Sequence, residues 1–108
     1  MMKTILLAIK PKWAEKIYSR EKHIEFRRAI PKCIHPGEEE YVNVLLYESA
    51  PVSKVTGRCL MCVSAFAPDG KFSDETLKKG CVTEQEMASY SRGLPVYALG
   101  VSGSEKWD

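Results

Sequence analysis

Hydrophobic and polar residues repeat along the chain with two different periods, and these periods predict its strands and helices. Residues 3–9 (KTILLAI) form a short, almost entirely apolar run, which predicts a strand buried on both faces. Pro11 follows at a position suited to the first turn of a helix, and apolar residues from Trp13 to Tyr18 then recur at helical spacing. The pattern predicts a short amphipathic helix that ends near Arg20, and it favours Trp13 as a core residue over Trp13 as a base-stacking residue.

The next stretch, SREKHIEFRRAI, changes to a period of two. Ile24 and Phe26 share one face, which is typical of a core, whereas His23, Glu25 and Arg27 share the other. This polar row is either the solvated face of an edge strand, where charge discourages aggregation, or the wall of a recognition groove.

Three further strands are predicted after an irregular loop, PKCIHPGEEE, which contains proline and glycine. The apolar runs 41–49, 53–68 and 94–103 are typical of strands, and Gly57 within the second run predicts a bulge or a sharp bend.

Capping residues delimit two further short helices. Asp74 is a suitable N-cap for the first helix, and Gly80 stops it. Thr83 and Glu86 form a capping box at the start of the second, which Gly93 ends.

The predicted order is therefore β-α-β-β-β-α-α-β, without repeats or a linker. We expect one domain over residues 1–103, followed by a flexible tail over residues 104–108. So many short strands in so few residues favour an α+β fold: a small, mixed, partly closed β-barrel of about five strands, with two or three short helices packed on its rim.

Composition agrees with a single folded unit. A chain of 108 residues, 44% hydrophobic and 28% charged, is long enough for one hydrophobic core and too apolar for a disordered protein. The first apolar run is much shorter than a membrane span or a signal-peptide core, so the sequence favours a cytoplasmic protein without membrane contact.

The four cysteines do not form a metal-binding pattern. Cys59 and Cys62 have the spacing of half a zinc site, but Cys33 and Cys81 are isolated. Residues three apart on a strand also point to opposite faces. We expect free, mostly buried thiols, and neither a metal nor another cofactor.

Basic residues are concentrated at the start of the chain. Residues 1–32 carry a balance of +6, whereas residues 33–108 carry a balance of −4. A local basic patch on a nearly neutral protein favours an anionic partner such as a phosphate or a nucleic acid. The alternative is a solvated basic face without a ligand.

The candidate functional group of residues consists of Lys22, Glu25 and Arg27, with His23 as an optional fourth member. A carboxylate held between cations stays ionised, so Glu25 is suited to accept a hydrogen bond from a base or to orient Arg27. Basic neighbours would contact phosphate. The complete predicted nucleic-acid-binding set is Lys10, Lys12, Lys22, Glu25, Arg27, Arg28, Tyr47 and Ser49.

Three stretches, LLAIKPKWAEKIYSREKHIEFRR, VLLYESAPVSKVTGRC and YSRGLPVYALGV, together resemble the ASCH domain family, part of the larger PUA-like group of barrels. The most specific matches are the helix start IKPKWAEKI, the K-x-x-E-F-R strand and the Y-x-S-x-P-V step. The resemblance implies a small β-barrel with a cleft beside the first helix, proposed to bind RNA or nucleotides. Arg20 and Glu21 stand where the family commonly has a glycine.

One branch of that family consists of acetylcytidine amidohydrolases. Lys22 matches the lysine of their site, but Glu25 stands where they have threonine. Their glutamate from a later helix could correspond to any of four acidic residues here, namely Asp74, Glu75, Glu84 and Glu86.

Two functions remain open, with a third behind them. The leading hypothesis is a module that binds nucleic acid, RNA rather than DNA, or a nucleotide. The alternative is a small nucleoside amidohydrolase or ribonuclease, in which Lys22 is the activating cation and Glu25 the base. A structural or protein-interaction role is the third.

Overall fold

The computed structural model describes residues 2–31, 34 and 40–108, and its elements follow in the predicted order. They are β1 (Thr4–Ile9), α1 (Pro11–Tyr18), β2 (Ile24–Arg27), β3 (Val42–Glu48), β4 (Lys54–Ala67), α2 (Asp74–Lys79), α3 (Glu84–Ser91) and β5 (Val96–Lys106). Most of the predicted loop PKCIHPGEEE lies outside the described residues.

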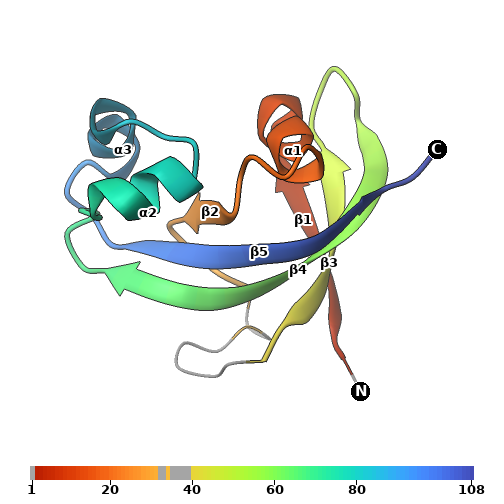
Figure 1. Ribbon diagram of the computed structural model, residues 1–108, viewed down its shortest axis with the longest axis horizontal. Helices are drawn as coiled ribbons and strands as arrows, with labels where there is room; N and C mark the ends of the chain where they lie inside the picture. The colour runs from red at the N-terminus through yellow and green to blue at the C-terminus, as the bar shows by residue number, and fades with distance from the viewer. Residues whose placement is uncertain (1, 32–33, 35–39) are drawn as a thin grey trace.

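The five strands form one sheet in the order β1-β3-β4-β5-β2, so that β1 and β2 are its edges. Only the β1–β3 pair is parallel. The sheet curls into a half-barrel, with α1 above one part of it and α2 and α3 above another, and β2 between them (Figure 1). The predicted partly closed barrel with short helices is confirmed.

Two hydrophobic cores lie on opposite faces of β5. Leu99 belongs to the core inside the half-barrel, which α1 covers with Ala14 and Ile17. The adjacent Ala98 belongs to a second core with α2 and α3. Because the side chains of successive residues on a strand point to opposite faces, β5 is buried on both sides.

Strand β2 is also buried on both faces, which the sequence did not predict. Ile24 and Phe26 lie in the second core as expected, with 8% and 7% of their surfaces exposed. Glu25, however, is only 5% exposed, so the middle of the polar row is buried, whereas His23 at its start is exposed. Helices α2 and α3 cover one side of β2, and α1 and the half-barrel cover the other.

The prediction that β1 is buried on both faces is wrong. Leu7 and Ile9 are buried, but Leu6 on the other face is 60% exposed. Among the described residues, β1 is an edge strand that buries one row of its side chains and leaves the other row exposed.

Gly57 marks a bend, as predicted, because β4 passes very close to β5 there. A side chain at Gly57 would collide with the carbonyl oxygen of Glu105, and pairing with β3 skips one residue of β4 beside it. Residues 104–106, expected to belong to a flexible tail, continue β5 to Lys106 opposite Gly57. Beyond it, the Trp107 N–H donates to the Thr56 carbonyl oxygen at 2.8 Å.

The helix termini largely follow their sequence signals. Thr83 and Glu86 form the predicted capping box of α3. Helix α2 is capped by Ser73 rather than by Asp74, because the Ser73 hydroxyl accepts from the Thr76 N–H at 3.2 Å. Within the described part of the chain, no helix is long and apolar enough to cross a membrane.

Candidate functional site

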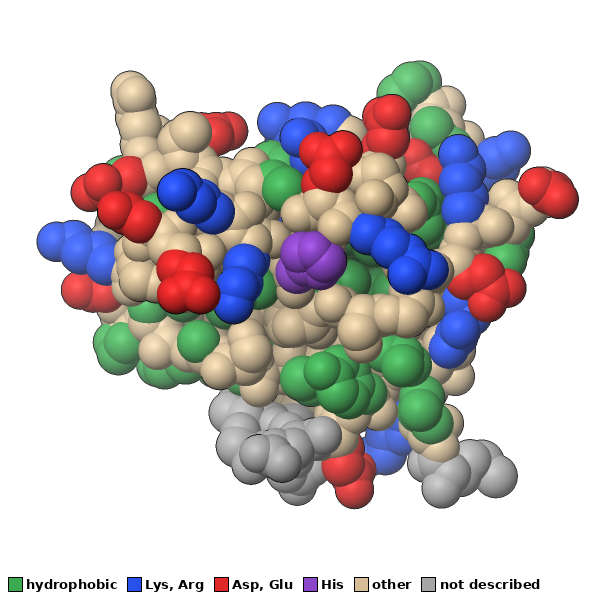
Figure 2. Space-filling model, viewed as in Figure 1, with side chains coloured by type: hydrophobic (Ala, Val, Ile, Leu, Met, Phe, Trp, Pro, Cys, Tyr) green, Lys and Arg blue, Asp and Glu red, His purple; other side chains and the backbone are tan. Residues whose placement is uncertain are grey.

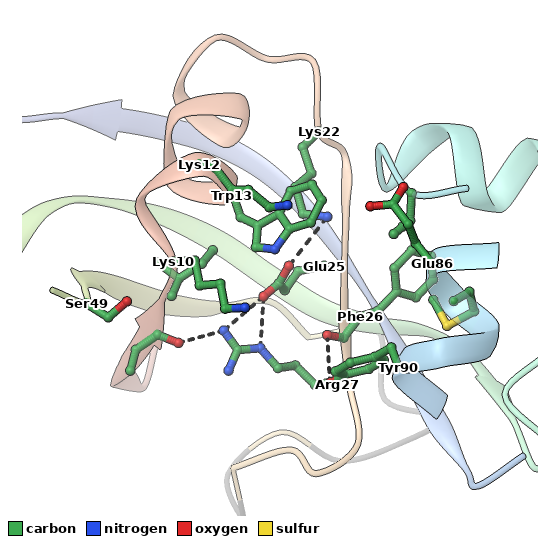
Figure 3. A pocket seen from close by; sticks show the side chains of 14 residues that line it. Lys10, Lys12, Trp13, Lys22, Glu25, Phe26, Arg27, Ser49, Glu86 and Tyr90 are labelled. Carbon is green, nitrogen blue, oxygen red and sulfur yellow. Dashed lines mark hydrogen bonds and ion pairs between the residues drawn. The ribbon is translucent and has the colours of Figure 1, made fainter. Parts of the chain in front are cut away.

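A pocket of about 420 Å³ lies where the half-barrel fails to close, between the end of β1, helix α1, strand β2 and helix α3 (Figure 3). It is lined by Ala8, Ile9, Lys10, Lys12, Trp13, Lys22, Glu25, Phe26, Arg27, Ser49, Val82, Glu86, Met87 and Tyr90. Aromatic and aliphatic side chains form its walls, and charged groups stand on its floor and rim.

The pocket owes its position to the free edge of β2. Since β2 pairs with β5 through Glu25 and Arg27, the backbone groups of Phe26 point away from β5. The Phe26 carbonyl oxygen accepts from the Tyr90 hydroxyl at 3.4 Å, which holds α3 against this edge. Across the gap, Arg27 Nη2 donates to the Ala8 carbonyl oxygen of β1 at 2.7 Å. A side chain therefore spans the gap between the two edge strands.

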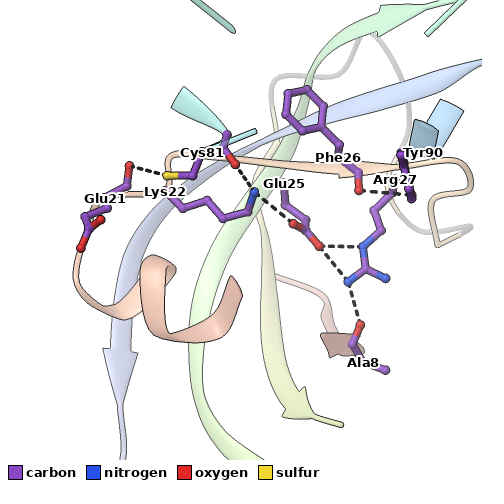
Figure 4. A network of polar contacts seen from close by, with 9 residues as sticks. Ala8, Glu21, Lys22, Glu25, Phe26, Arg27, Cys81 and Tyr90 are labelled. Carbon is purple, nitrogen blue, oxygen red and sulfur yellow. Dashed lines mark hydrogen bonds and ion pairs between the residues drawn. The ribbon is translucent and has the colours of Figure 1, made fainter. Parts of the chain in front are cut away.

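Lys22, Glu25 and Arg27 form the predicted charged group on the pocket floor (Figure 4). Glu25 Oε2 accepts from Arg27 Nε at 2.9 Å and lies 2.9 Å from Arg27 Nη2. Glu25 Oε1 lies 3.5 Å from Lys22 Nζ. One carboxylate thus holds both cations, each through a different oxygen.

Lys22 is almost completely buried, with 2% of its surface exposed. Its ammonium donates to the Gly80 carbonyl oxygen at 2.5 Å and lies 4.5 Å from the ring centre of Trp13. Burial away from water lowers the pKa of Lys22, and the charge of Glu25 opposes this shift. The Lys22 ammonium is therefore stabilised by contacts with the protein and not by water.

Three further residues of the predicted set, Lys10, Lys12 and Ser49, also line this pocket. Lys10 is the N-cap residue of α1, and its exposed side chain lines the pocket at the rim. Four cations line the pocket against two carboxylates, those of Glu25 and Glu86. The pocket is therefore net positive, whereas the face in Figure 2 mixes both signs.

Three predicted residues lie elsewhere. Arg28 stacks over the ring of Tyr90 at 5.1 Å and donates to its carbonyl oxygen, away from the pocket lining. Tyr47 lies on the face of β3 opposite the buried Leu46, because side chains alternate along a strand. His23, the optional member, is exposed and lines a separate cavity of about 190 Å³.

Sequence reasoning missed the wall of the pocket that comes from α3. Glu86 and Tyr90 are four residues apart and share one face of that helix, but the sequence did not show what this face meets. Glu86 alone among the four acidic candidates lines the pocket. Its carboxylate accepts from the Thr83 N–H at 3.0 Å, and this bond lowers the pKa of Glu86. Trp13, interpreted as a core residue, also faces the pocket.

No group of three or more metal-binding side chains occurs among the described residues. Cys59, Cys62 and Cys81 are free thiols, and burial raises the pKa of Cys59 to about 12. Cys33 lies outside the described residues. The polar side chains that line the pocket are those of lysine, arginine, glutamate, serine and tyrosine residues.

Comparison with known proteins supports the fold and leaves the function open. No family model and no curated protein matches the chain. The curled sheet with helices at its gap has the same fold as solved structures of an ASCH protein, as the sequence resemblance implied.

Three crystal structures of the ASCH protein from Zymomonas mobilis carry this conclusion. The unmutated protein is 24% identical, with a TM-score of 0.71, and the match covers 96% of this chain and 70% of that one. A tyrosine-to-phenylalanine variant gives 22% identity, a TM-score of 0.74 and coverage of 96% and 72%. A serine-to-alanine variant gives 24% identity, a TM-score of 0.69 and coverage of 96% and 70%.

Proposed function

We propose that the protein binds a nucleotide or single-stranded RNA in the pocket between α1 and α3. The observation that carries this proposal is the combination of a net positive rim, aromatic walls and a carboxylate on the floor of one pocket. Its volume of about 420 Å³ falls within the range of small-molecule sites. A nucleotide matches each part, since it combines a flat base with an anionic phosphate.

The floor and the rim have separate roles in this proposal. Glu25 Oε1 faces Lys22 at 3.5 Å, longer than a hydrogen bond, and it accepts from a base amine or a ribose hydroxyl. Lys10 and Lys12 contact phosphate at the rim, and the Ser49 hydroxyl supplies a further polar contact. Arg27 orients Glu25 and offers Nη1 to the ligand, because its hydrogen bonds to other described residues use Nε and Nη2.

RNA suits the pocket better than duplex DNA. A single strand can place one unstacked base in a pocket, and its ribose hydroxyl is a donor that DNA lacks. The ASCH fold is consistent with this proposal, which rests on the pocket itself.

Binding to short single-stranded RNA and to ribonucleoside monophosphates tests the proposal. We expect wild-type binding that weakens with salt, and Lys10→Ala should reduce the salt slope for RNA by about 0.7 if it removes one phosphate contact. Lys71→Ala removes the same charge from an exposed site outside the pocket and should leave binding unchanged. Equal effects of the two substitutions, or no binding at all, would contradict the proposal.

Hydrolysis of a nucleoside or RNA is a second candidate, favoured by one observation. Lys22 has a lowered pKa and lies beside a carboxylate, an arrangement that can activate a nucleophile or a leaving group. Product analysis of the binding mixtures tests it. Turnover that Lys22→Met abolishes, with the fold intact, would establish an enzyme, whereas binding without product would leave a binding module.

A further inference from the structure

One indole ring in the pocket contacts two ammonium groups. The ring centre of Trp13 lies 4.4 Å from Lys12 Nζ and 4.5 Å from Lys22 Nζ. Figure 3 shows Lys12 lying against Trp13 at the mouth of the pocket. Attraction between an ammonium and the electron-rich face of an indole holds each cation over the ring.

The two lysines are held very differently. Lys22 is buried, and both Gly80 and Glu25 bind its ammonium. Lys12 is exposed, and no ion pair of Lys12 occurs among the described residues. An ammonium that is itself exposed to water is held only weakly by the ring beneath it. Lys12 can therefore leave the ring at little cost, whereas Lys22 cannot.

We propose that Trp13 is the base-stacking residue of the pocket and that Lys12 covers it until a nucleotide binds. This inference rests on the proposed function and deepens it. The base takes the place of the Lys12 ammonium over the indole, and Lys12 turns to the phosphate of the same nucleotide. The expected ligand is therefore an aromatic base that carries a phosphate. Its base stacks on Trp13 and its phosphate binds Lys12.

The proposal gives Lys12→Ala opposite effects on two ligands. A nucleoside has no phosphate, so removing Lys12 uncovers the ring without losing a contact, and affinity should rise by about two- to fivefold. A nucleoside 5′-monophosphate loses its cation, so affinity should fall by at least about twofold. Calorimetric titration of the four ribonucleosides and their 5′-monophosphates measures both effects, with Lys71→Ala as the charge-matched control.

Fluorescence reports whether the base reaches Trp13. The chain has two tryptophans, and Trp107 is 42% exposed and outside the pocket lining, so Trp107→Phe leaves Trp13 as the only reporter. Stacking should quench it on titration. In binding assays, Trp13→Leu should weaken nucleotide affinity by about tenfold, whereas Trp13→Phe should keep much of it. Circular dichroism confirms that each variant is folded.

The outcomes separate this inference from the function beneath it. Opposite signs for nucleoside and nucleotide in Lys12→Ala, with quenching of Trp13, would support it. If nucleotides bind wild type but Lys12→Ala leaves nucleoside binding unchanged or weaker, the stacking exchange is wrong and the proposed function stands. If no nucleotide binds wild type at all, the proposed function fails as well.

Discussion

At the scale of single residues, the buried ammonium of Lys22 couples the pocket to stability. Its pKa lies below the ordinary lysine value of 10.5 because burial disfavours the charged form. Between these two pKa values the unfolded chain binds more protons than the folded one, so this residue makes the free energy of unfolding rise with pH. Below that window the folded state carries the full cost of the buried charge.

Lys22→Met removes this contribution, which gives the first prediction. We expect the stability of wild type relative to Lys22→Met to increase between pH 7 and about pH 11, by up to roughly 1.4 kcal/mol for each unit by which the pKa is lowered. Urea denaturation of both proteins at the two pH values measures the difference, in which all other titrating groups cancel. A stability difference that stays constant or falls with pH would show that the pKa of Lys22 is not lowered in the folded state.

Arg20 has a backbone conformation that glycine adopts more easily. It stands where the resembling family commonly has glycine, and its φ of 68° is in the left-handed region that favours glycine. Arg20→Gly should therefore raise stability by about 0.5–1 kcal/mol, which is about 2–8 °C in Tm for a domain of this size. Arg20→Ala, which keeps the strain, is the matched control. Equal melting temperatures for both variants would refute the prediction.

At the scale of elements, the sequence pattern predicted much of the fold but not most of the pocket. The element order, the bend at Gly57 and the capping box of α3 depend on local rules, and local rules can be read from one sequence. The double burial of β2 cannot, because it depends on α2 and α3 packing on the outer face of a strand far away in sequence. For the same reason the charged pocket residues between Lys10 and Arg27 were predicted, whereas Trp13 of α1 and Tyr90 of α3 were not.

Arg27 is the side chain by which two elements depend on each other. It joins β2 to β1 through the Ala8 carbonyl oxygen and holds Glu25 at the same time. Arg27→Ala leaves a buried carboxylate with one cation fewer, so we expect a loss of about 1–3 kcal/mol in urea denaturation. Arg28→Ala, which removes a neighbouring exposed guanidinium outside the gap, should cost less. If the two variants are equally stable, Arg27 does not close the gap.

At the scale of the whole molecule, the curl of the sheet depends on the last residues of the chain. Beyond its pairing with β2, strand β5 continues along the first half of β4, where Arg58 and Glu105 are partners. The Ser104 hydroxyl also donates to the Ile17 carbonyl oxygen at 3.1 Å, which ties this end of β5 to α1. The segment expected to be a flexible tail therefore links the sheet to the helix that carries Lys12 and Trp13.

Deleting residues 104–108 should consequently destabilise the whole fold. The truncated chain loses the β5 partner of Gly57 and Arg58 and the bond from Ser104 to α1, so we expect a loss of roughly 2–4 kcal/mol and weaker nucleotide binding. Deleting only Asp108, which lies beyond β5, is the control and should leave Tm unchanged. Thermal denaturation followed by nucleotide titration measures both effects. If the truncated protein melts and binds like the full chain, residues 104–108 do not contribute to stability. Helix α1 would then be positioned by its connection to β1 and by the core alone.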